Sequence, residues 1–171
     1  MKPVARIVSG ALCAGLLSRA IAAVAAYHEP ATQQAATAKA LFRPLAAKLR
    51  RSGMPVLVPA AIPWDRLKVT AAGASHGSYF VTLSFTAGCD TGACVYGGIG
   101  GTRTASSRAG GRPVPLKLGV TGHLIVPAKC TSRCTSTLYF AYHGVAYEID
   151  ASDTDANLIE MGQHVVPIAT L

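Results

Sequence analysis

The sequence predicts an α+β fold, in which an antiparallel meander sheet of about five or six strands is covered by an N-terminal and a C-terminal helix. Three observations carry this prediction. Apolar and polar residues alternate in several short segments between positions 67 and 150, as in strands that bury one face. Apolar residues recur at helical spacing before this region and again after it. A helix at each end of an antiparallel region gives a two-layer α+β domain.

Residues 1–26 have the composition of a secretory signal peptide. Lys2 and Arg6 precede an apolar run, and small residues follow it. Arg19 interrupts the apolar character, so the run is too short for a permanent anchor. We therefore expect cleavage after residue 26, a single exported domain at residues 27–171, a periplasmic or secreted location, and no transmembrane anchor after cleavage.

The mature chain has a modest positive charge. The sequence carries 16 Lys and Arg against 8 Asp and Glu, and removal of the signal peptide leaves 13 against 8, a formal charge of +5. The basic residues are spread over three stretches without one dense run of interleaved aromatics. This balance suits acidic envelope surfaces or polysaccharide, and we expect no nucleic-acid partner.

An amphipathic helix is expected from Thr32 to Arg51. Pro44 should kink this helix or begin its second half, and Gly53 fits its C-terminal cap. We expect the apolar stripe to pack on the protein's own sheet, and binding to a membrane surface or a partner is the alternative. The stripe consists of Ala38, Leu41, Phe42, Leu45, Ala46 and Leu49.

The first strands are predicted between positions 54 and 99. Prolines make Met54–Pro63 an extended edge segment. A short strand is expected at Leu67–Val69, and the residues AAGASHG after it read as a loop. Alternation predicts a strand at Ser78–Thr86, and a glycine-rich strand is expected at Val95–Ile99.

A second hairpin is expected after a Gly-, Ser- and Arg-rich surface loop at residues 100–113. Its sequence, VPLKLGVTGHLIVP, should turn near Leu118-Gly119. Leu124 then lies on one side of the returning strand, and His123 and Ile125 lie on the other.

A third hairpin turns at His143-Gly144. This turn places Phe140 opposite Tyr147 on the core face and Tyr139 opposite Glu148 on the other face. The pattern is that of an antiparallel sheet packed on one side only.

The last predicted element is a C-terminal helix. Asp153 and Thr154 supply N-cap chemistry, and Pro167 should end the helix. Its apolar face would consist of Leu158, Ile159, Met161, Val165 and Val166.

Four cysteines remain in the mature chain: Cys89, Cys94, Cys130 and Cys134. An even number in an exported chain predicts two disulfides, for which three connectivities exist. We favour the local pairs, Cys89 with Cys94 and Cys130 with Cys134, because either loop can close by itself; cross-pairing is the alternative. A zinc site made of these thiolates and His143 is a further alternative, but an oxidising compartment favours disulfides.

The sequence contains no recognisable catalytic set. Asp90-Thr91-Gly92 matches the short signature of aspartic proteases, but there is no second such triplet and Asp90 is explained as a turn former. Ser78, Ser84, Ser106 and Ser136 lie outside any Gly-x-Ser-x-Gly setting. We therefore assign no catalytic residue, no cofactor and no metal.

Six features are spread along most of residues 54–169: PVLVPAAIP, TLSFTAGCDTGAC, TGHLIVPAKC, the C-x3-C corner, YFAYHGVAYEI and LIEMGQHVVPIA. Together they resemble a group of small exported bacterial proteins of uncharacterised function. More remotely, the hairpin and closing helix are similar to periplasmic domains that hold apolar ligands in a curved sheet, as lipoprotein carriers do, which implies a fold and not a function.

These observations favour a non-enzymatic binding or structural module of the bacterial envelope. Phe80 and Tyr139 are expected to line the ligand face of the sheet, which would accept an apolar ligand such as an acyl chain, a peptide or an envelope component. The alternative is a small secreted hydrolase whose site is not recognisable from the sequence. A buried histidine beside a serine or aspartate in a cleft would favour the hydrolase.

Overall fold

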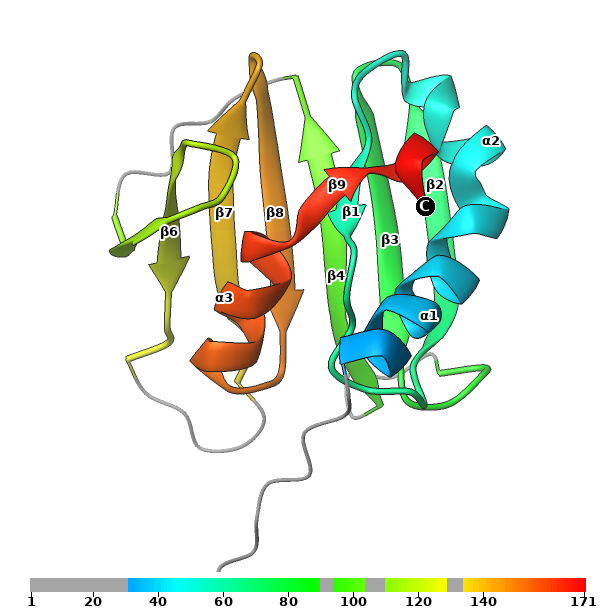
Figure 1. Ribbon diagram of the computed structural model, residues 1–171, viewed down its shortest axis with the longest axis horizontal. Helices are drawn as coiled ribbons and strands as arrows, with labels where there is room; N and C mark the ends of the chain where they lie inside the picture. Colours follow the sequence, from blue (N-terminus) through cyan, green and yellow to red (C-terminus); the bar gives the residue numbers. More distant parts are fainter. Residues whose placement is uncertain (1–30, 90–93, 104–109, 129–133) are drawn as a thin grey trace, which may run out of the picture.

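The computed structural model describes residues 31–89, 94–103, 110–128 and 134–171. Its main element is a seven-stranded antiparallel sheet in the order β2-β3-β4-β8-β7-β6-β5 (Figure 1). The chain passes from β4 in the sheet to β5 at the far edge. The next three strands, β6, β7 and β8, return towards the centre, where β8 pairs with β4. The strands are β2 (Lys68–Ser75), β3 (Ser78–Ser84), β4 (Val95–Thr102), β5 (Arg112–Pro115), β6 (Thr121–Ile125), β7 (Ser136–Tyr142) and β8 (Val145–Ala151).

One face of the sheet is covered by helices and by a two-stranded antiparallel ribbon (Figure 1). The N-terminal helical segment lies over β2 and β3, α3 packs on β7 and β8, and the ribbon lies between them. We call this the covered face; the opposite, open face carries no such layer in the described part of the chain. The covering elements are α1 (Ala31–Phe42), η1 (Arg43–Leu45), α2 (Ala46–Leu49), η2 (Arg50–Ser52), α3 (Asp155–Gln163), the turn η3 (Ile168–Thr170), and the ribbon strands β1 (Leu57–Pro59) and β9 (Val165–Pro167).

The predicted α+β class is confirmed, with helices at both ends on one face of an antiparallel sheet. The sheet has seven strands where five or six were expected, and its order is not that of a simple meander. This difference from a meander results from the connection between β4 and β5, which crosses to the far edge. The last strand of the sheet, β8, consequently lies beside β4 in the middle.

The β7–β8 hairpin has the predicted turn and register. His143 and Gly144 both have positive φ, at 49° and 75°, as a two-residue turn requires. Phe140 pairs with Tyr147, and both are buried in the core with stacked rings.

The N-terminal helical segment packs its apolar stripe on the sheet. Ala38, Phe42 and Leu49 are fully buried. Pro44 lies in the 3-10 turn between α1 and α2, as its missing amide donor suggests, and Gly53 ends the segment with φ 67°.

Strand β2 is longer than the sequence predicted, because residues expected to form a loop continue the strand to Ser75. Ala and Gly have low strand propensity, but here pairing with β3 overrides it. The ring of Phe80 lies directly over Gly73, where an added Cβ would be 2.5 Å from Cε1 of the ring. A cross-strand aromatic of this kind stabilises a strand glycine. Strand β4 likewise runs beyond the predicted end at Ile99.

The C-terminal helix is shorter than predicted. Thr154 is its N-cap and accepts a hydrogen bond from the Asn157 amide, but the helix ends at Gln163. Val165 and Val166 belong to β9 and pair with β1. These β-branched residues favour a strand once a partner is present, and that partner lies more than 100 positions earlier in the chain.

Three tyrosines connect the sheet to its covering layer. The Tyr79 hydroxyl donates to the Leu57 carbonyl (2.6 Å) and accepts from the Leu57 amide (3.2 Å), which fixes the ribbon. The Tyr147 hydroxyl donates to the carbonyl of Pro55 (3.0 Å). The Tyr96 hydroxyl donates to Oδ2 of Asp153, just before α3 (2.9 Å). Burial raises the pKa of all three above the usual value, to about 12 for Tyr147.

Candidate functional site

The open face of the sheet contains a hollow of about 510 Å³ over strand β4. Its floor is formed by Gly98 and Gly100, which present backbone without side chains. A Cβ added at Gly100 would have a single neighbour within 4 Å, the carbonyl oxygen of Tyr79 at 3.2 Å. Glycine within a strand often marks a position that a ligand approaches closely. We call this site the open-face hollow.

Two aromatic side chains stand on opposite sides of this floor. Phe80 on β3 pairs with Gly100, Gly100 pairs with Glu148 on β8, and Glu148 pairs with Tyr139 on β7. Neighbouring strands lie about 4.8 Å apart, so the backbones of Phe80 and Tyr139 are separated by roughly 14 Å. The two rings therefore form the side walls of a shallow site.

The aromatic walls differ in their surroundings. Phe80 is 52% exposed and its ring lies over Gly73, away from the glycine floor. Tyr139 is partly buried and its ring lies 5.9 Å from the ring of His123 on β6. The Tyr139 hydroxyl is buried, and among the described residues it has no hydrogen-bond partner.

Two carboxylates also line the open-face hollow. Glu148 and Asp150 are two residues apart on β8, so they point to the same face of the sheet. Thr137 Oγ1 donates a 2.8 Å hydrogen bond to Oδ1 of Asp150. The site thus combines apolar walls with hydrogen-bond acceptors that carry negative charge.

Both residues that the sequence assigned to a ligand face, Phe80 and Tyr139, line this hollow. Ligand binding there stays a prediction. Sequence reasoning missed the glycine floor and the carboxylates as site residues. The hairpin pattern had already set Tyr139 opposite Glu148, but nothing local indicated that the glycine-rich β4 would lie beside β8.

Two of the described histidines, His143 and His164, have defined places in the fold. His164 has Nε2 2.7 Å from Nζ of Lys117, and its Nδ1 lies 3.0 Å from the Glu160 carbonyl oxygen. His143 lies in the β7–β8 turn. Within the described ranges no hydrogen bond joins a histidine to a serine, and no three His, Cys, Asp or Glu residues are placed to hold a metal ion. The Asp90-Thr91-Gly92 triplet lies outside the described residues.

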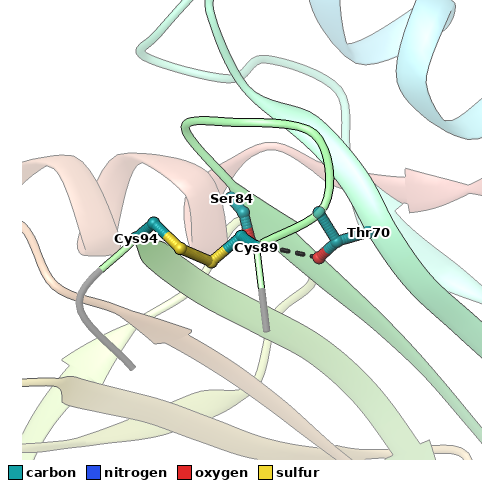
Figure 2. Close-up of a disulfide and its surroundings, with 4 residues drawn as sticks. All are labelled: Thr70, Ser84, Cys89 and Cys94. Atoms are coloured by element: carbon teal, nitrogen blue, oxygen red, sulfur yellow. Dashed lines mark hydrogen bonds between the residues drawn. A yellow bond between two sulfur atoms is a disulfide. The ribbon is translucent and has the colours of Figure 1, made fainter. Parts of the chain in front are cut away.

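The disulfide between Cys89 and Cys94 is present, as the local pairing predicted (Figure 2). It closes the connection between β3 and β4, with a Cα–Cα distance of 5.8 Å. These two sulfurs are therefore not available as zinc ligands. Cys134 is also disulfide-bonded, and its predicted partner, Cys130, lies outside the described residues.

A hydroxyl pair lies next to this disulfide (Figure 2). Thr70 and the buried Ser84 have their hydroxyl oxygens 3.0 Å apart. Thr70 is the extra residue of a bulge in β2, so its side chain helps to fix the irregular end of the sheet.

No helix in the described ranges is long and apolar enough to cross a membrane. No protein-family model matches the chain, and neither the curated proteins nor the solved structures include one with significant similarity to it. The site is therefore interpreted from its own residues.

Proposed function

We propose that this protein is a non-enzymatic binding module of the bacterial envelope, which holds its ligand in the open-face hollow. The observation that carries this proposal is the bare glycine floor of Gly98 and Gly100 between the aromatic walls Phe80 and Tyr139. Aromatic rings provide a large contact area at a low cost in side-chain entropy, and they are enriched in binding sites for that reason.

Export follows from the predicted signal peptide at residues 1–26 and is supported by the chemistry of the cysteines. Disulfides persist in oxidising compartments and are rare in the cytosol. The Cys89–Cys94 bond is compatible with a periplasmic or secreted protein.

The carboxylates indicate which of the expected ligands suits the hollow best. A bare acyl chain would cover Glu148 and Asp150 without offering a hydrogen-bond donor or a charge to either carboxylate, which is costly. A peptide with Lys or Arg side chains would meet the carboxylates with charge-assisted hydrogen bonds and the rings with cation–π contacts. We therefore propose a basic peptide as the ligand.

The test is an NMR titration of the mature protein with tetralysine, and with decanoate as the acyl-chain probe. Tetralysine should shift the backbone amides of Gly98 and Gly100, and decanoate should not. Phe80→Ala and Tyr139→Ala should each weaken tetralysine binding about fivefold, as expected for the loss of one cation–π contact of about 1 kcal/mol.

A matched control lies just beyond the end of β3. Phe85 is 38% exposed and does not line the open-face hollow, so Phe85→Ala should bind like the unaltered protein. Unchanged amide shifts with tetralysine, or an equal loss of affinity in Phe85→Ala, would refute the basic-peptide ligand. Binding of decanoate at the glycine floor would retain a ligand site there and replace the peptide with an acyl chain.

A further inference from the structure

A second site lies on the other side of the molecule, and it does not depend on the open-face hollow. We propose that a basic groove between the N-terminal helical segment and the turn η3 binds an acidic polysaccharide chain. The groove has a volume of about 590 Å³, and three basic side chains line it: Lys39, Arg43 and Arg50.

The groove lies in the most basic part of the described chain. Lys39, Arg43 and Arg50 are exposed, and so are Lys48 and Arg51 nearby. No Asp or Glu occurs between positions 30 and 64 of the sequence. Among the described residues, no ion pair involves any of these five cations. The positive charge of this surface is therefore not neutralised by acids of its own segment.

The fold holds these cations in place. Lys39 and Arg43 are four residues apart, so they lie on the same side of the helix, about 6 Å apart along its axis. Phe42, which precedes Arg43, and Leu49, which precedes Arg50, are fully buried in the core and fix the orientation of the segment. The basic side chains consequently remain on the outer surface, where a ligand can reach them.

The groove favours a hydrophilic polymer over a membrane. The alternative raised by the sequence was a helix that lies on a membrane by its apolar stripe, but Ala38, Phe42 and Leu49 of that stripe are buried against the sheet. The large exposed apolar side chains of the described residues also lie elsewhere. They are Trp64, Phe80, Phe85 and Val126.

A sugar chain fits the lining better than a peptide. Around the cations the groove is lined by Pro44, Ala46, Ala47, Ile168, Ala169, Thr170 and Leu171. Ile168 belongs to the core, so few large apolar side chains are left for a peptide to contact. The planar guanidinium groups of Arg43 and Arg50 match carboxylate, sulfate or phosphate groups with paired hydrogen bonds. An acidic sugar chain presents such groups repeatedly along its length.

The test measures binding of polygalacturonate to the mature protein by calorimetry, with uncharged dextran as the neutral polymer. The triple variant Lys39→Gln, Arg43→Gln, Arg50→Gln should lose at least tenfold in affinity for polygalacturonate. The control variant Arg66→Gln, Lys68→Gln, Lys117→Gln removes the same charge from exposed positions outside the groove and should lose less than twofold. Binding of the unaltered protein should weaken as salt rises, since the contacts are ionic.

Each other outcome overturns the proposal. Equal losses in the two triple variants would show attraction by net charge alone. Preferred binding to anionic phospholipid vesicles or to polyglutamate would assign the groove to a membrane or an acidic peptide, and no binding of any polyanion would remove the site. Circular dichroism and thermal unfolding must show that both triple variants fold. Since the groove and the open-face hollow lie on opposite faces of the sheet, failure here leaves the tetralysine result unaffected.

Discussion

The two faces of the sheet are built from alternate residues of the same strands, yet they differ in burial and in the side chains they carry. In the β7–β8 hairpin, Phe140 and Tyr147 face the covering layer and are almost fully buried, whereas Tyr139 and Glu148, one position away, line the open-face hollow. Burial on the covered face supplies most of the hydrophobic stabilisation. The open face therefore tolerates two carboxylates that a core would exclude.

Two neighbouring glycines of β4 show the same contrast. A Cβ at Gly101, on the covered face, would lie 2.6 Å from Cε1 of Tyr79 and 2.9 Å from Cε of Met54. Gly100, on the open face, has no side chain near it. The first glycine makes room for the core, and the second keeps the hollow open.

Raising the pH should have the largest effect, because it deprotonates the three tyrosines whose hydroxyls connect the sheet to its covering layer. The pKa of Tyr147 is about 12 in the folded protein against 10 when unfolded, and burial raises the pKa of Tyr79 and Tyr96 as well. A tyrosine whose pKa is raised in the folded protein contributes its full stabilisation below pH 10, the pKa of the unfolded state. This contribution is lost as the pH rises through the pKa of the folded state. We expect cooperative unfolding above pH 10. Circular dichroism and tyrosinate absorbance, recorded together as the pH is raised, will measure it.

The matching control is Tyr147→Phe, in which the loss of stability between pH 10 and 12 should be smaller. Tyrosinate absorbance that rises fully near pH 10 while the protein stays folded would show that these hydroxyls are open to solvent. The division between the two faces would then be wrong.

Truncation of one phenylalanine on each face tests the same division between the two faces. Phe140 on the covered face is 2% exposed and Phe80 on the open face is 52% exposed. Phe140→Ala should lower the free energy of unfolding by about 3–5 kcal/mol, because it leaves a cavity in the core. Phe80→Ala should cost about 1 kcal/mol or less, from the uncovering of Gly73, which denaturant titration of both variants will measure. Similar losses in the two variants would contradict the one-sided core.

The glycine pair gives the next largest difference. Gly101→Ala should destabilise the protein by about 1–3 kcal/mol, because a methyl group there overpacks the core. Gly100→Ala should cost about 1 kcal/mol or less, since the new methyl group enters the hollow and meets only the Tyr79 carbonyl oxygen, 3.2 Å away, which must shift slightly. The same Gly100→Ala variant should bind tetralysine more weakly. An intact tetralysine affinity would place the ligand away from this floor.

These contrasts also explain which features were readable from the sequence. The β7–β8 hairpin could be predicted, because its turn at His143-Gly144 and its alternation of apolar and polar residues are local signals. The outward direction of Phe80 and Tyr139 followed from the same alternation. Their meeting at one hollow depends on β3, β4, β8 and β7 being neighbours in this order, which is decided by a crossover and by pairing over long distances in the chain.

The missed elements have the same cause. Strand β2 was read in part as a loop because its small residues favour no strand by themselves, and the ring that covers Gly73 comes from the next strand. The ribbon of β1 and β9 joins residues near opposite ends of the chain, so no short window contains its pattern. Sequence periodicity identifies which face a residue takes but not which strand lies beside it.

The smallest expected effect comes from removing one oxygen atom on each face. Tyr79→Phe takes away the partner of both the amide and the carbonyl of Leu57, a buried residue of the covering ribbon, and should cost about 1–2 kcal/mol. Tyr139→Phe removes a buried hydroxyl that has no partner among the described residues, and should change stability by less than about 0.5 kcal/mol or raise it slightly. Denaturant titrations of the two variants give this difference directly. A loss in Tyr139→Phe as large as in Tyr79→Phe would mean that the open-face hydroxyl is bonded in solution, and the walls of the hollow would then contribute to folding as the covered face does.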